Sequence, residues 1–164
     1  MRYCYLESPI GPLLLAADED ALRHIGFPKH QKPEQPQAGW VESSPRGVLA
    51  EACKQLREYF AGRRTEFDLP LAAEGTAFQR NVWNTLAKIP YGETISYGEL
   101  ARRVGNPKAS RAVGSANGKN RLPIVIPCHR VIAADGSLGG FGGGLPTKVK
   151  LLELERGSRT GSLK

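Results

Sequence analysis

The sequence contains few cysteines, few aromatic residues and no long apolar run. Its three cysteines in 164 residues are an odd number without close spacing. This pattern argues against a disulfide framework and favours a reducing compartment. Residues 1–5 lack the apolar stretch of a secretory signal, and the apolar runs are far shorter than a membrane span. We therefore expect a soluble, cytoplasmic protein made of one domain of ordinary size or of two small ones.

Negative charge is scarce in the second half of the chain. Residues 1–72 carry a formal net charge of −1, whereas residues 73–164 carry +8. A basic half beside a nearly neutral one suggests a polyanionic partner, most simply nucleic acid, because neutralising phosphates releases counterions. A solvated basic face that only keeps the protein in solution is the alternative.

The first half of the chain has the pattern of a small α/β domain. Short apolar segments separated by turn residues predict antiparallel strands, followed by a surface loop and then by a helix whose apolar residues recur every three or four positions. The expected strands are residues 2–7, 12–17 and 22–27, the loop is 28–43, and the helix follows Ser44-Pro45 and ends before Gly62. Cys53 lies on the apolar stripe of this helix and is expected in the core. We place the domain boundary between residues 72 and 73.

The second half is expected to be mostly helical. Thr76 with Gln79, and Ser96 with Glu99, have the spacing of capping boxes at helix starts. A helix over residues 97–104 is ended by Gly105, and Asn106-Pro107 can open the next one, which runs to about residue 117. Two short helices joined by a glycine-containing turn form a helix-turn-helix candidate, although an ordinary helical hairpin has the same pattern. The outer side of the second helix would carry Lys108, Arg111, Gly114 and Ser115.

Cys128 and His129 are the best candidates for chemistry, because they follow the apolar run 124–126 and set a nucleophile beside a base. A cysteine reacts as the thiolate, which nearby cations favour. If the segment is extended, the two side chains point to opposite faces, and a proton would pass between them through a water. The alternative is a cysteine that only packs in the core. The following loop, residues 135–144, is rich in glycine but lacks the spacing of a phosphate-binding loop.

These motifs together resemble the O6-alkylguanine-DNA alkyltransferase family, the methylated-DNA-protein-cysteine methyltransferases. The motifs follow one another in the family's order: Ile-Pro-Tyr-Gly, Ile-Ser-Tyr, Gly-Asn-Pro-Lys-Ala, Arg-Ala-Val-Gly and Pro-Ile-Val-Ile-Pro-Cys-His-Arg-Val. The resemblance is densest from residue 76 to residue 155. It implies a ribonuclease H-like N-terminal part with a small antiparallel sheet and a helix. A mostly helical domain with a helix-turn-helix would follow, binding DNA and accepting the alkyl group.

The resemblance implies DNA repair by transfer of an alkyl group from O6-alkylguanine, and from O4-alkylthymine, to the protein itself. The target nucleotide would be flipped out of double-stranded DNA, and the second helix would enter the minor groove. The implied catalytic residues are the acceptor Cys128, the base His129, its orienting partner Glu155, Asn120 as a brace and Tyr97 as a donor to the guanine ring. Arg111 would fill the gap that the flipped nucleotide leaves in the DNA base stack, and Lys108, Gly114 and Ser115 would contact the DNA beside it. The walls of the base pocket would be Pro123, Val131, Phe141 and Gly142.

Each molecule would act once as a monomer, because a thioether offers water no acyl carbonyl to attack. We predict no cofactor and no metal, since Cys4, His24 and His30 do not match the zinc positions of some relatives. Many relatives have tyrosine where this chain has Phe141, and some have serine at Gly142, so its tolerance for larger alkyl groups is left open. A cysteine hydrolase and a DNA-binding helix-turn-helix module without alkyl transfer are the alternatives.

Overall fold

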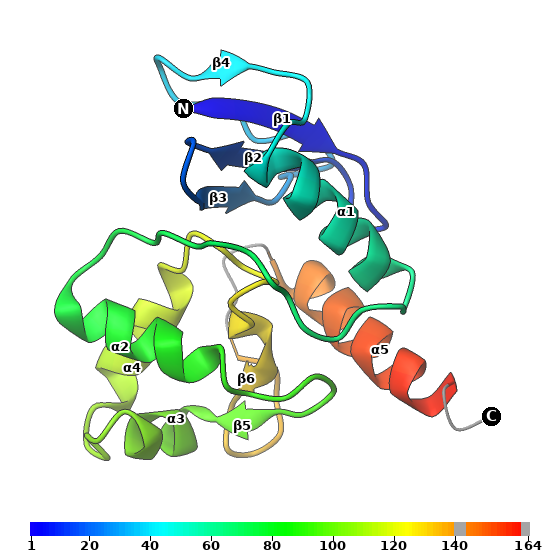
Figure 1. Cartoon of the computed structure of the whole chain (residues 1–164). Helices are drawn as coiled ribbons and strands as arrows, with labels where there is room; N and C mark the ends of the chain where they lie inside the picture. The colour runs from blue at the N-terminus through cyan, green and yellow to red at the C-terminus, as the bar shows by residue number, and fades with distance from the viewer. Residues whose placement is uncertain (140–143, 162–164) are drawn as a thin grey trace. The chain divides into compact units, whose positions relative to one another are not determined.

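The computed structural model describes residues 1–139 and 144–161, which form two compact units, 1–73 and 74–164. The first unit is a four-stranded sheet with one helix (Figure 1). The second unit contains the remaining four helices and a two-stranded sheet within its described part. This mixed α/β architecture, with small sheets and five α-helices, agrees with the predicted fold class at the level of element content.

The sheet of the first unit has the strand order β3-β2-β1-β4. Its strands are β1 (Arg2–Leu6), β2 (Leu13–Ala17), β3 (Leu22–Gly26) and β4 (Val41–Glu42). The first three pair antiparallel as predicted, and the register runs from Arg2 opposite Ala17 to Leu6 opposite Leu13. The expectation of a purely antiparallel sheet is wrong at one edge, because β4 lies within the predicted loop and pairs parallel to β1.

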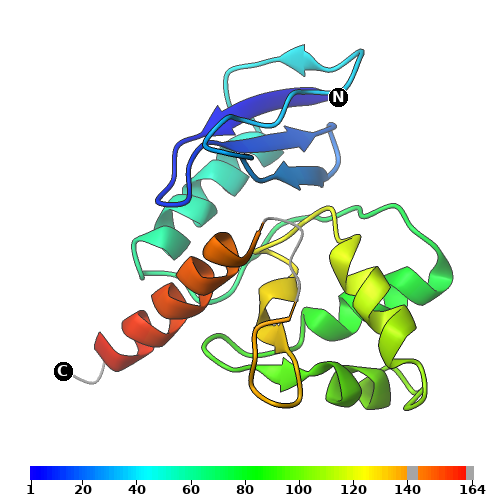
Figure 2. The same ribbon diagram turned by 180° about the vertical axis from the view of Figure 1, so that it is seen from behind.

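Helix α1 (Val48–Phe60) covers one face of this sheet, as the two opposite views agree (Figures 1 and 2). It begins three residues after the predicted Ser44-Pro45 start, with Gly47 at the N-cap position. Cys53 is buried on the apolar stripe of this helix, as predicted. Its sulfur lies 3.8 Å from that of Cys4 on β1, and both thiols are free. The two cysteines therefore act as packing residues in the core of the first unit.

In the second unit, α2 (Ala77–Leu86) shows the predicted capping box. Thr76 Oγ1 accepts from Gln79 N, and the Gln79 side chain accepts from Thr76 N. Helix α3 (Tyr97–Arg103) shows only half of the second predicted box. Ser96 accepts from Glu99 N, but the Glu99 carboxylate binds Arg102 and Arg103 instead of returning to the cap. The competing arginines on the next turn explain this difference.

Helix α4 spans Ser110–Gly118 and starts later than predicted. Asn106 O accepts a hydrogen bond from Ala109 N, so residues 106–109 form a turn and not the first turn of the helix. Val113 and Ala116 are buried, whereas Ala112 is exposed. The unit also contains β5 (Ile95–Ser96), which pairs parallel to β6 (Val131–Ile132), and α5 (Leu145–Gly161).

Candidate active site

Cys128 is the first residue of a short 3-10 turn, η1 (Cys128–Arg130), directly before β6. The turn is closed by a 3.0 Å hydrogen bond from Arg130 N to Pro127 O, while Cys128 N donates to Ile126 O at 2.8 Å. The expected extended geometry at Cys128 is therefore wrong, because successive side chains of a 3-10 turn diverge by about 120° and not by 180°. The thiol is buried, with 5% of the residue exposed.

Two asparagines brace the segment that leads to Cys128. Asn120 Nδ2 donates to Ile126 O at 2.8 Å, and Asn120 Oδ1 accepts from Leu122 N at 2.9 Å. Between these contacts Ile124 has a φ of 74°, an unfavourable conformation for a β-branched residue. Asn117, at the end of α4, donates to Cys128 O at 3.3 Å. Asn120 thus holds both Leu122 and Ile126 in the segment before Cys128, and no signal in the sequence pointed to Asn117.

His129 and Glu155 form a buried pair between η1 and α5. His129 Nε2 and Glu155 Oε2 lie 2.6 Å apart, and both side chains are almost completely buried. Glu155 Oε1 also accepts from Gly92 N at 3.2 Å. His129 Nδ1 has no hydrogen-bond partner among the residues that the structure describes. The imidazole is therefore held through one nitrogen, and its second nitrogen can accept a proton.

Arg130 completes this network. Its Nε and Nη2 atoms donate to the two oxygens of Glu155 at 2.8 and 3.0 Å, and its Nη1 donates to Ile89 O at 2.7 Å. Burial alone would raise the pKa of Glu155. The hydrogen bonds from His129 and Arg130, and the positive charge beside the carboxylate, outweigh burial and hold the pKa at about 2. Glu155 is thus an anion at any physiological pH.

The two groups that would exchange a proton are both neutral at rest. Burial raises the pKa of the Cys128 thiol to about 11, although the Asn120 side chain and the charge of Lys148 act to lower it. Burial also lowers the pKa of His129, and this effect outweighs the opposite influence of Glu155. The site therefore holds a thiol and an imidazole, not a preformed thiolate-imidazolium pair.

Lys148 is a second cation of the site that sequence reasoning missed. Its ammonium group is completely buried and donates to Val131 O at 2.7 Å and to Leu138 O. Burial lowers its pKa, and the neighbouring Cys128 would raise it. A lysine on a helix gives no sequence signal that it is buried, since Lys150 on the same helix is exposed.

Tyr97, the first residue of α3, lies between the glycine-rich loop and α4. A methyl group added at Gly139 would come within 3.2 Å of the Tyr97 hydroxyl, and one added at Gly114 would lie 3.8 Å from its ring. Burial and the charge that Cys128 carries as a thiolate both raise the pKa of the phenol. Tyr97 therefore stays protonated and can donate a hydrogen bond.

Comparison with known proteins identifies the family. Residues 77–157 match the model of the 6-O-methylguanine DNA methyltransferase DNA binding domain, and residues 1–73 match that of the ribonuclease-like domain. The chain belongs to the 6-O-methylguanine DNA methyltransferase family. The predicted family and its enzyme class, methylated-DNA-protein-cysteine methyltransferase, are thereby confirmed.

Individual relatives match over nearly their whole length. The methylated-DNA-protein-cysteine methyltransferase of Methanosarcina acetivorans is 53% identical over 94% of this chain and 98% of its own. The methylated-DNA-protein-cysteine methyltransferase of Mycobacterium leprae is 51% identical, and the match covers 92% of this chain and 90% of the relative. A crystal structure of Mycobacterium tuberculosis OGT in complex with DNA has a TM-score of 0.88 and 46% identity. The match covers 96% of this chain and 94% of that one.

The residues that the family resemblance assigns to DNA binding and to the pocket lie as follows. Lys108, Arg111 and Ser115 are exposed on α4 and the turn before it, and Gly114 is half-buried. Pro123 and Val131 are buried. Phe141 and Gly142 lie outside the described residues. Three of the four residues assigned to DNA binding are therefore exposed, whereas only part of the predicted pocket can be described.

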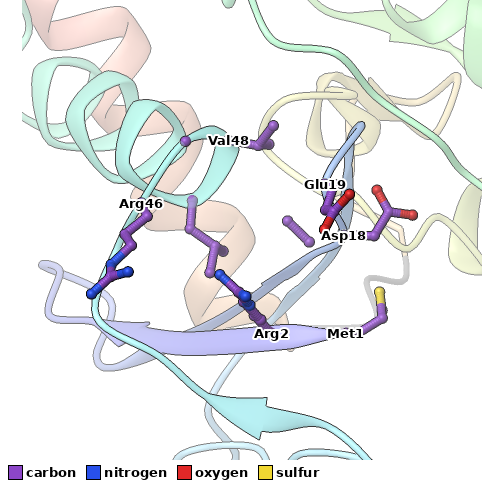
Figure 3. A pocket seen from close by; sticks show the side chains of 9 residues that line it. Met1, Arg2, Asp18, Glu19, Arg46 and Val48 are labelled. Carbon is purple, nitrogen blue, oxygen red and sulfur yellow. The ribbon is translucent and has the colours of Figure 1, made fainter.

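A cavity of about 390 Å³ lies in the first unit, where α1 begins beside the first two strands (Figure 3). Arg2 and Arg46 line it together with Asp18 and Glu19, and no cysteine or histidine contributes. No pattern in the sequence predicted this cavity.

Elsewhere in the first unit His24 pairs with Glu34 at 2.5 Å, and His30 is exposed. Among the described residues no three histidine, cysteine or carboxylate side chains are grouped as metal ligands. No helix in the described ranges is long and apolar enough to cross a membrane.

Proposed function

We propose that the protein repairs DNA by transferring an alkyl group from O6 of guanine to the sulfur of Cys128. The observation that carries this proposal is the buried Cys128 thiol beside His129, whose free Nδ1 and Glu155-bound Nε2 make it a base. Membership of the methyltransferase family supports the reaction class. The crystal structure of the M. tuberculosis relative is a complex with DNA, which supports binding to the same polymer.

The transfer begins with removal of the proton from Cys128. Because the pKa of the thiol is about 11 and that of His129 is lowered, proton transfer at rest is unfavourable and becomes favourable only as the alkyl group moves. A water passes the proton to His129 Nδ1 while Glu155 holds Nε2. The sulfur electron pair forms the new S–C bond, and the pair of the breaking C–O bond remains on the guanine. Tyr97 donates to a ring nitrogen of the leaving base, where negative charge develops.

The product is a thioether, so the reaction is irreversible and each monomer acts once. A thioether has no carbonyl for water to attack, and the other two thiols of the chain, Cys4 and Cys53, are buried against each other in the first unit. The same displacement at a saturated carbon would also remove an alkyl group from O4 of thymine, whose oxygen leaves in the same way. No cofactor takes part in these steps.

DNA binding is assigned to residues 73–164, and residues 1–72 form an N-terminal ribonuclease H-like domain. Helices α3 and α4 act as a helix-turn-helix, with α4 in the minor groove of double-stranded DNA. The exposed Lys108, Arg111 and Ser115 support this role, as does the small residue Gly114, which permits close approach. Arg111 fills the gap left by the flipped nucleotide, which costs a few kcal/mol to extrude. Pro123 and Val131, both buried, form walls of the pocket for the base.

A stoichiometric titration tests this function. A duplex with a single O6-methylguanine is mixed with increasing protein, and the methylated base that remains is quantified after digestion to nucleosides. We expect one methyl group to be removed per chain and no more, with no removal by Cys128→Ala. Cys53→Ala is the matched control, because it removes another buried thiol and should retain transfer. Removal beyond one equivalent would indicate turnover, and binding without any removal would indicate a DNA-binding module.

A further inference from the structure

Arg130 is a buried arginine whose guanidinium group is shared between Glu155 and the backbone. Only 5% of the residue is exposed. Two of its nitrogens bind both oxygens of Glu155, and the third binds Ile89 O at 2.7 Å. The carbon at the centre of the guanidinium group lies 5.7 Å from the centroid of the Tyr91 ring. These contacts fix the cation against the carboxylate.

Burial is the largest effect that keeps His129 unprotonated beside a carboxylate, and the buried ion pair between Arg130 and Glu155 adds to it. An unpaired buried carboxylate 2.6 Å from an imidazole would strongly favour the imidazolium ion. Here Arg130 neutralises Glu155, and Lys148 adds a further positive charge to the surroundings of His129. The other titratable neighbour of His129 on η1 is Cys128, a neutral thiol that adds no charge. Helix α2, which also packs against η1, contributes only Arg80 among charged residues, and that side chain is exposed.

We propose that Arg130 is a positioning residue for alkyl transfer: by neutralising Glu155 it acts together with burial to keep His129 uncharged, with Nε2–H toward the carboxylate and Nδ1 free to accept the proton of Cys128. This inference rests on the proposed function. An imidazolium ion in the same place would have no lone pair at Nδ1 and would leave the thiol protonated. Arg130 thus acts on the reaction through Glu155 and His129 without touching the substrate.

Nuclear magnetic resonance of the histidine ring nitrogens tests the inference without any substrate. The chain has three histidines, so the signals of His24 and His30 serve as internal references. In the wild type we expect His129 to be a neutral Nε2–H tautomer at pH 7 and to stay neutral as the pH falls toward 6. In Arg130→Met and Arg130→Gln its protonation midpoint should rise by at least about one pH unit.

The rate of alkyl transfer provides the second readout. In the wild type the single-turnover rate should change little between pH 8 and pH 6. In Arg130→Met and Arg130→Gln it should fall about tenfold for each pH unit below the new midpoint, and raising the pH should restore it. A merely structural defect would lower the rate at every pH. Arg130→Lys is the matched control, because it keeps the positive charge and should keep the wild-type midpoint.

The outcomes separate this inference from the proposed function. If the wild type transfers no alkyl group, the proposed function fails, and the nitrogen spectra still decide whether Arg130 controls His129. If the wild type transfers the group and His129 titrates unchanged in a folded charge-removing variant, the inference about Arg130 is wrong. Glutamine can still donate one hydrogen bond to Glu155, so Arg130→Gln replaces Arg130→Met if the latter does not fold.

Discussion

Replacing Glu155 with glutamine should destabilise the second unit by about 3 kcal/mol at neutral pH. The carboxylate accepts hydrogen bonds from Gly92, His129 and Arg130, and glutamine would turn an NH2 group toward some of these donors. It would also leave the buried Arg130 cation without its counter-ion. Because the Glu155 side chain is only 1% exposed, water cannot replace the lost acceptor.

The magnitude follows from two separate estimates. A carboxyl group whose pKa falls from 4.5 to about 2 on folding contributes about 3 kcal/mol of stability at neutral pH. Removing one partner of a buried ion pair typically costs about 3–5 kcal/mol. The contribution of Glu155 is complete above pH 4.5 and disappears as the pH falls through about 2. The difference between the wild type and Glu155→Gln should therefore shrink over that range.

Urea unfolding measured by tryptophan fluorescence is the assay. The chain has two tryptophans, and in a Trp40→Phe background Trp83 reports on the second unit alone. Glu153→Gln is the matched control, because Glu153 is exposed on the same helix and should change stability by less than about 0.5 kcal/mol. Equal stabilities of Glu155→Gln and Glu153→Gln at pH 7 would refute the account of the buried network.

Two further predictions concern single contacts. Thr76→Ala removes the capping box of α2 and should lower the free energy of unfolding by about 1 kcal/mol in the same urea assay. An unchanged urea midpoint would contradict a stabilising role for this cap. Gly139→Ala puts a methyl group 3.2 Å from the Tyr97 hydroxyl and should slow single-turnover alkyl transfer about tenfold or more. Gly136→Ala is its control, because Gly136 also has a positive φ but open space, and equal rates in the two variants would exclude a role for the Tyr97 contact.

Local signals in the sequence predicted the elements whose determinants are also local. The Thr76 and Gln79 side chains specify the start of α2 within four residues, and the structure shows both of their hydrogen bonds. By contrast, β4 and β5 have only two residues each and exist because of partners far along the chain. No pattern within two residues distinguishes such a strand from a loop. The start of α4 was also misplaced, since Asn106 belongs to a turn before the helix and Ala109 holds the N-cap position.

The candidate site was predictable where its residues are adjacent or belong to a motif. Cys128 and His129 stand side by side in the sequence, whereas Glu155 is 26 residues away and was named only through the family resemblance. The burial of Arg130 and Lys148 was missed. Composition treats every lysine and arginine as a surface charge, and only the fold decides which of them lie against a carboxylate or backbone carbonyls.

The central claim is that Cys128 is the alkyl acceptor, and the most direct test is the mass of the intact protein after reaction with an O6-methylguanine duplex. The account predicts a gain of about 14 Da, one methyl group per chain, found after proteolysis on the peptide with Cys128 and absent from those with Cys4 and Cys53. An unchanged mass while the methyl group leaves the DNA, or a methyl group on another residue, would contradict it.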